Sequence, residues 1–229
     1  MNYNFNQSPI EAENGLRKYM TSVFNKMFLA LCLTGIVSYI CTMNEQLLAV
    51  LSRGVGVILT IATFGIVIYI TARIHKIATD TANALFWIYS ALTGASLSPL
   101  FFVYTGESIA SAFFTTAIFF GSMSAYGYIT KKDLSGVGSF MTVGLISIII
   151  ASLVNIFLKS SLVQMGLSVL SIIVFCGLTA YDIQKIKSFY NPSDDADVNA
   201  KRGVIGALSL YLDFLNIFLS LLRLLDNRK

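Results

Sequence analysis

The stretch LSLYLDFLNIFLSLLRLL, residues 208–225, decides the fold because it is long and apolar enough to cross a membrane. About 20 helical residues, rising 1.5 Å each, cross the roughly 30 Å hydrocarbon layer of a bilayer. This stretch nevertheless holds Asp213 in its middle and Arg223 near its end. A charged side chain at mid-bilayer costs at least about 2.5–3.5 kcal/mol. Asp213 is therefore a candidate functional residue.

The composition supports the same fold class. Of 229 residues, 55% are hydrophobic and 12% are charged, about half the charged share of a typical soluble domain. We therefore predict an all-α, polytopic membrane protein with seven transmembrane helices. The seven apolar runs lie at 22–43, 51–72, 83–104, 108–129, 138–158, 163–186 and 203–225. Residues 1–21 form a short polar N-terminus, 22–225 a single seven-helix domain, and 226–229 a tail.

The distribution of Lys and Arg predicts the orientation. Eleven basic residues lie on the side that holds the N-terminus, whereas the opposite connections hold Arg53 and Lys159. Since basic residues favour the cytoplasmic side, we expect a cytoplasmic N-terminus. If the protein is bacterial, the expected membrane is the inner membrane. A re-entrant last run would add Arg223, Arg228 and Lys229 to the cytoplasmic side and strengthen this bias, but its uninterrupted apolar length from 203 to 225 favours a full crossing.

The basic residues and the cysteines exclude some partners. Lys and Arg stand singly or in pairs between apolar runs, which is typical of membrane loops. We therefore expect membrane lipid as a partner, and no nucleic acid. Cys32, Cys41 and Cys176 lie in or beside apolar runs without metal-site or disulfide spacing, and we expect buried thiols. No cofactor is predicted.

Two acidic residues lie inside apolar runs, Asp182 and Asp213. Counted from Asn191 and Gly203, they lie nine and ten residues inward, so both are about 13–15 Å deep on consecutive helices. Two carboxylates in contact at low dielectric share one proton, which makes the pair a pH sensor. The structural alternative is that Asp182 pairs with Lys185 and Asp213 accepts hydrogen bonds from its neighbours.

Two further groups of residues have both a functional and a structural interpretation. Glu45 and Arg223 fall at similar depth near the outer surface, close to Arg53, and could form a latch, although an interfacial arginine needs no partner. The third run contains small residues and a proline that predict either a pore-lining kink or close helix packing. These residues are Gly94, Ser96, Ser98 and Pro99.

Four ordered motifs resemble the Bax inhibitor-1 family, bacterial branch. They are TGASLSPLFFVYT (93–105), YGYITKKDLSGVGSFMTVGLI (126–146), LTAYDIQKIK (178–187) and RGVIGALSLYLDFLNIFLSLLRLL (202–225). The resemblance implies a seven-helix protein that leaks calcium down its gradient, gated by pH through an aspartate pair. Asp182 and Asp213 match that pair, and they would also be transient contacts for Ca²⁺, which is the transported ion. Carboxylate oxygens suit this hard cation.

Two other functions stay open at this point. One is a non-transporting regulator that binds other membrane proteins, for example a membrane AAA protease, as the resemblance also implies. The other is an intramembrane aspartyl protease, whose first motif the Tyr181–Asp182 pair resembles. The second motif of that class is Gly-x-Gly-Asp, and here Tyr211 and Leu212 precede Asp213, which does not match it. The sole histidine, His75, lies in a connection between runs and there is no H-E-x-x-H motif, so we predict no enzyme.

Overall fold

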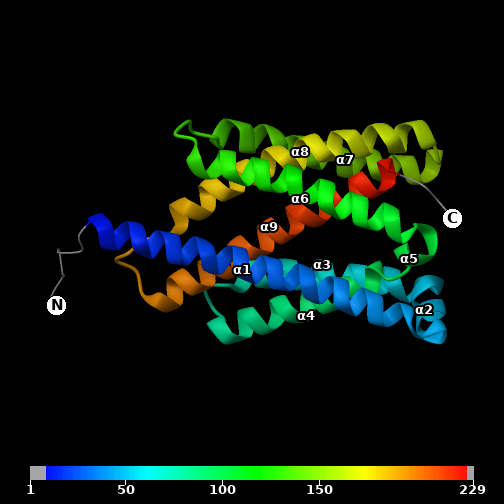
Figure 1. Ribbon diagram of the computed structural model, residues 1–229, viewed down its shortest axis with the longest axis horizontal. Helices are drawn as coiled ribbons and strands as arrows, with labels where there is room; N and C mark the ends of the chain where they lie inside the picture. The colour runs from blue at the N-terminus through cyan, green and yellow to red at the C-terminus, as the bar shows by residue number, and fades with distance from the viewer. Residues whose placement is uncertain (1–8, 226–229) are drawn as a thin grey trace. The chain divides into compact units, whose positions relative to one another are not determined.

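The structure is a computed structural model that describes residues 9–225, and these residues confirm the all-α prediction. In chain order the elements are α1 (Pro9–Thr42), α2 (Glu45–Val50), the π-helix η1 (Leu51–Val55), α3 (Gly56–Arg73), α4 (Thr79–Leu97), α5 (Leu100–Val103), α6 (Gly106–Ile129), α7 (Ser135–Leu158), α8 (Ser161–Phe189) and α9 (Ala196–Leu224) (Figure 1). Within the described range, seven helical segments are long and apolar enough to span a membrane, with α4 and α5 forming one segment.

Several helices extend beyond the apolar runs that predicted them. Helix α1 begins at Pro9, inside the expected polar N-terminus, with a proline at its first position and Glu11 in its first turn, both favourable at a helix start. Helix α9 begins at Ala196, seven residues before the predicted run, where Asp197 pairs with Lys201 at 2.8 Å. Residues 1–8 and the predicted tail 226–229 lie outside the described part of the structure.

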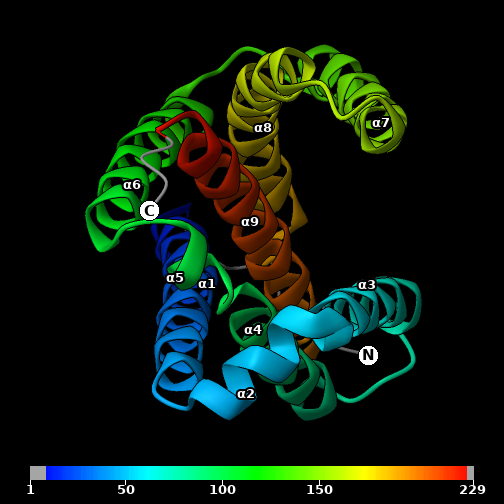
Figure 2. The ribbon, with the colours of Figure 1, turned by 90° about the vertical axis from the view of Figure 1, so that its right-hand side faces the viewer.

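The chain divides into two compact units. Unit 1 contains the residues up to Leu97 together with Lys185–Leu208, and unit 2 contains Ser98–Gln184 together with the residues from Ser209. Each unit therefore takes one part of α8 and one part of α9. In unit 1, α4 packs against both α1 and α3 and lies between them (Figure 2).

The contact between α1 and α4 is close because small side chains face each other. The Thr34 hydroxyl donates to the Ser90 carbonyl oxygen at 2.9 Å. A methyl group on Gly94 would collide with the backbone of Thr34. Glycine at this position therefore lets the two helix backbones approach each other, as small residues commonly do in membranes.

The α8–α9 connection in unit 1 is an ordered turn, held by side chains of the helices it joins. Arg202 donates to the Phe189 carbonyl oxygen at 2.7 Å, which satisfies one unpaired carbonyl at the end of α8, and it also forms an ion pair with Asp194. Asn199 donates to the Asn191 carbonyl oxygen at 2.9 Å. The polar tract around 188–203 is thus part of the folded unit.

Unit 2 contains α5, α6, α7, most of α8 and the second part of α9. Figure 2 shows the end of α9 between α6 and α8, with α7 on the other side of α8. Gly127 of α6 lies against the backbone of Ala180 on α8, and Gly177 of α8 lies against Met141 of α7. Glycines therefore bring α8 close to both neighbouring helices.

The connection between α6 and α7 is anchored to α8 by one side chain. Gln184 accepts a hydrogen bond from the Leu134 backbone N–H and donates to the Lys132 carbonyl oxygen, both at 2.8 Å. These two bonds satisfy loop backbone groups that have no partner in a helix. The loop therefore has a defined position on α8.

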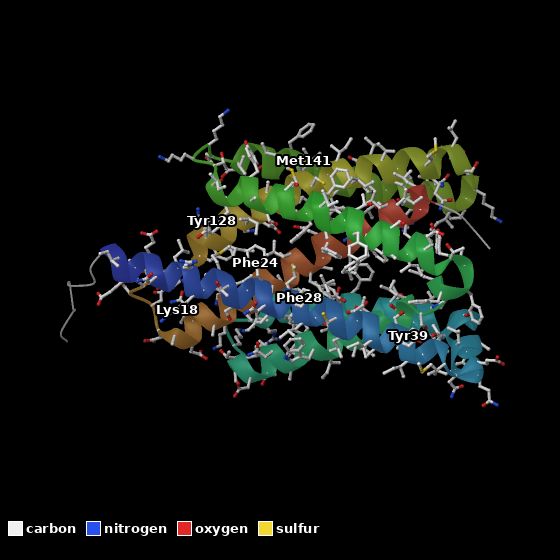
Figure 3. All side chains as sticks on the ribbon, in the orientation of Figure 1. Lys18, Phe24, Phe28, Tyr39, Tyr128 and Met141 are labelled. Atoms are coloured by element: carbon white, nitrogen blue, oxygen red, sulfur yellow. The ribbon has the colours of Figure 1, made fainter. Side chains whose placement is uncertain are left out.

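Large apolar side chains on the outer surface are expected where a helix faces lipid. Phe28 and Tyr39 on α1 are 60% and 56% exposed (Figure 3). Cys32 of the same helix is also exposed, so the expectation of three buried thiols is wrong at this position. Cys41 is buried and Cys176 is half-buried. The apolar sequence around Cys32 indicated burial in lipid, which composition does not distinguish from burial in protein.

Candidate functional site

The centre of the candidate site is the carboxyl group of Asp213 on α9, in unit 2. Asp213 is only 4% exposed, and its Oδ2 atom has no hydrogen-bond partner among the described residues. The next residue, Phe214, packs edge-on against Phe113 and Phe120 of α6, with ring centroids 5.6 and 5.5 Å apart. These ring contacts pack this part of α9 against α6.

Helix α8 presents three side chains to Asp213. Thr179 forms a hydrogen bond with the Asp213 carboxyl group, and Asp182 and Cys176 interact with it electrostatically. Residues three apart are neighbours on one face of a helix, and Cys176, Thr179 and Asp182 follow that spacing. The structure therefore brings Asp182 and Asp213 together on facing parts of α8 and α9.

The hydroxyl group of Thr179 has one proton and two acceptor lone pairs. Its Oγ1 atom donates to the Phe175 carbonyl oxygen at 2.7 Å. The same hydroxyl group also takes part in the hydrogen bond with the Asp213 carboxyl group, so it lies between two acceptors. The side chain of Asn216 directs its donor elsewhere, since Nδ2 donates to the Leu212 carbonyl oxygen at 2.8 Å.

The two aspartates differ in burial. Asp213 is buried, whereas Asp182 is half-buried. Because a charge is more costly the more deeply it is buried, the charged form costs less at Asp182 than at Asp213. The sequence predicted equal depth for the two aspartates, counted from Asn191 and Gly203. In the structure α8 ends at Phe189 and α9 begins well before Gly203, so these reference points do not mark the helix ends.

The latch residues lie in separate units. Glu45 is exposed at the first position of α2 in unit 1, and Arg223 is exposed near the end of α9 in unit 2. Arg53 lies in η1, and its side chain is outside the described part of the structure. A latch between Glu45 and Arg223 stays a prediction.

The small residues of the third run occupy distinct positions. Gly94 lies at the α1–α4 contact, and the Ser96 hydroxyl donates to the Thr93 carbonyl oxygen at 2.9 Å. Helix α4 ends at Leu97, Ser98 is fully buried, and Pro99 caps the short helix α5. The interruption of the spanning segment therefore coincides with the boundary between the two units.

Two residues of the site were not predicted from the sequence, Thr179 and Cys176. The signal that could have identified them is their spacing of three and six residues before Asp182, which places them along one side of α8. Among residues 9–225 no three His, Cys, Asp or Glu side chains gather as a metal-binding group.

These features define an integral, multi-pass, all-α membrane protein, with seven spanning segments among residues 9–225 and a buried carboxyl group on α9 that faces α8. Residues 16–229 match the family described as "Inhibitor of apoptosis-promoting Bax1". The chain belongs to the Bax inhibitor-1 family, which confirms the resemblance of its four motifs.

The relatives are similar over nearly their whole length. The E. coli K12 inner membrane protein YbhL is 43% identical over 226 residues, which cover 97% of each chain. An uncharacterised protein of Rickettsia prowazekii is 46% identical over 218 residues, covering 95% of this chain and 92% of that protein. A further one, from Borreliella burgdorferi, is 41% identical over 215 residues, which cover 93% of each.

Proposed function

We propose that this protein is a passive Ca²⁺ leak channel whose flux depends on pH, with Asp182 and Asp213 as a proton-sharing sensor. The observation that supports this proposal best is the 4% exposed carboxyl group of Asp213, which lies on a membrane-spanning helix beside a second carboxyl group. An ionisable side chain inside a membrane costs free energy, so its presence there indicates a functional role. The proposed role is non-enzymatic, and Ca²⁺ is the transported ion, which the two carboxylates contact transiently.

The sensor operates through the number of protons on the pair. At low pH one shared proton joins the two carboxyl groups and therefore joins α8 to the second part of α9. As the pH rises the proton leaves, two like charges face each other at low dielectric, and the helices tend to part. Loss of the proton also makes Asp213 compete for the Thr179 hydroxyl, which otherwise donates to the Phe175 carbonyl oxygen.

The surroundings of the pair favour a local switch. On α8, the titratable groups that interact with Asp213 are Asp182 and Cys176. On α6, the contacts with the adjacent Phe214 come from the aromatic rings of Phe113 and Phe120. Apolar rings on one side keep the local dielectric low, which strengthens both the shared hydrogen bond and the repulsion that replaces it.

Calcium flux into liposomes that contain only the purified protein tests this function. An indicator dye trapped inside should report entry faster than in empty liposomes at pH 8, because a leak needs neither an energy source nor a partner. An ionophore added at the end calibrates the total signal. Flux equal to that of empty liposomes at every pH from about 5 to 8 would remove the channel and leave the regulator of other membrane proteins, such as a protease.

The proposed location is the inner membrane with the N-terminus in the cytoplasm, supported by the excess of Lys and Arg on that side and by the inner-membrane relative. A cysteine at the exposed position Ser193, in a variant without the three native cysteines, should resist an impermeant maleimide in intact cells and react after permeabilisation. Lys159→Cys, predicted on the opposite side, is the control and should react in intact cells. The reverse labelling pattern would overturn this orientation.

A further inference from the structure

The first half of α1 carries polar side chains in a regular pattern. Polar pairs recur every four residues, at Arg17–Lys18, Thr21–Ser22 and Asn25–Lys26. Positions four apart lie on one face of a helix, so the three pairs form two adjacent rows. The opposite face holds the half-buried Phe24 and four residues that are 0–8% exposed: Tyr19, Met20, Val23 and Met27. This segment of α1 therefore has a packed apolar face and an outward polar face.

The polar face is hollowed into an open groove of about 450 Å³, and all three polar pairs line it. Three of its lining residues are cationic and none is acidic. The Ser22 hydroxyl group and the Asn25 amide supply additional hydrogen-bond donors, whereas the Thr21 hydroxyl donates to the Arg17 carbonyl oxygen at 2.8 Å. Several donors around a net charge of about +3 match the several acceptor oxygens of a phosphate group.

The depth of the groove indicates which phosphate it meets. Helix α1 has 34 residues and is about 51 Å long, whereas roughly 20 residues cross the hydrocarbon layer. If the apolar end at Thr42 marks one surface of that layer, the other surface falls near Ser22, in the middle of the groove. Phe28 and Leu29, 60% and 54% exposed, lie nearly two turns deeper than Ser22, and Phe28 is labelled in Figure 3. The hydrogen-bond donors lie at the level of the lipid headgroups, and the apolar side chains lie below them. This order matches a phospholipid, whose phosphate lies above its acyl chains.

We propose that this groove on α1 binds the phosphate headgroup of an anionic phospholipid. Arg17 and Lys18 contact the phosphate from the headgroup level, Lys26 reaches it from one turn below by extending its side chain outward, and Leu29 packs against the acyl chains. The groove lies wholly in unit 1 and its lining includes neither aspartate of the proposed sensor. The site is therefore independent of the proposed calcium leak.

Binding should depend on the three cations in a measurable way. Each Lys or Arg near an anionic lipid surface contributes about fivefold in affinity, so removal of all three should weaken binding roughly 100-fold. The interaction should also weaken as salt is raised, because the groove is open and its charges are screened.

The test uses the purified full-length protein in detergent and measures the rise in its unfolding temperature as lipid is added. Phosphatidylglycerol should stabilise the wild type at concentrations where phosphatidylcholine does not. The variant Arg17→Gln/Lys18→Gln/Lys26→Gln should need roughly 100-fold more phosphatidylglycerol for the same rise. The control, Lys131→Gln/Lys132→Gln/Lys159→Gln, loses the same charge outside the groove and should respond as the wild type does.

Three results would overturn the proposal. These are equal responses of the two triple variants, equal stabilisation by phosphatidylcholine, and equal stabilisation by millimolar inorganic phosphate, which would make the ligand a soluble anion. Should the triple variant fail to fold, Lys18→Glu is the substitute, since Lys18 is exposed (Figure 3). It should bind at least fivefold more weakly than the matched Lys131→Glu, whose residue is also exposed and lies outside the groove.

Discussion

Calcium flux through this protein in liposomes should rise as the pH is raised from about 5 to 8, and Asp213→Asn or Asp182→Asn should flatten that rise. The shared proton stabilises the closed form and is lost as the pH increases, so the sign of the wild-type profile is positive. Control by one proton allows a slope of up to about tenfold per pH unit. Asparagine keeps the shape of the side chain but removes one ionisable group, so no like-charge pair can form.

An aspartate outside the spanning segments provides the matched control. Asp133 precedes α7, and hydrogen bonds from the Ser135 side chain and backbone N–H lower its pKa below the usual range. Asp133 is therefore ionised throughout this pH window, and Asp133→Asn should keep the wild-type profile. If both variants of the pair also keep that profile, the pair is not the sensor and Asp213 is a structural hydrogen-bonded acid.

The second large effect is expected at the contact between α6 and α8. Gly127→Ala should lower the stability of the protein by about 1–3 kcal/mol, because the added methyl group would overlap the backbone of Ala180, which cannot rotate away. The unfolding temperature in detergent measures this loss. Since Ala180 follows Thr179 directly, the same variant should also alter the pH profile of calcium flux.

The control for this substitution lies on the same helix. Gly121 has no atom within 4 Å of a built Cβ among the described residues, so Gly121→Ala meets open space. Alanine is the better helix former by roughly 1 kcal/mol, and this variant should be as stable as the wild type or more so. Equal unfolding temperatures for Gly121→Ala and Gly127→Ala would show that the α6–α8 approach does not depend on glycine.

The seven spans could be predicted because hydropathy measures how favourably a segment transfers from water into lipid, and seven segments of this chain are strongly apolar. Their ends could not, because a helix can continue into water where packing supports it. Tyr19 and Met20 are 8% and 3% exposed and hold the polar part of α1 in place from Pro9 onward. The Arg202 contacts do the same for the connection before the predicted start of α9.

The aspartates were identifiable because a charge in an apolar run is costly and therefore conspicuous. Thr179 could not be identified in this way. A threonine in a membrane helix has a small free-energy cost, because its hydroxyl donates to a carbonyl oxygen one turn earlier, here that of Phe175. The unequal burial of Asp182 and Asp213 depends on which neighbouring helices cover each side chain. That is a tertiary property, and no pattern within either helix encodes it.

The burial of α9 has a consequence for biogenesis. In its most apolar 18-residue window 72% of residues are buried, against 6% for α7, although α9 is synthesised after all the other described helices. Helix α7 can therefore enter the lipid as it emerges from the ribosome, whereas α9 needs the earlier helices as its environment. Because α9 is synthesised after α6 and α8, Asp213 enters the bilayer when Thr179 and the aromatic rings of α6 have already been inserted. A chain truncated within α9 would leave those helices inserted but without their final partner, a form that membrane quality-control proteases should remove.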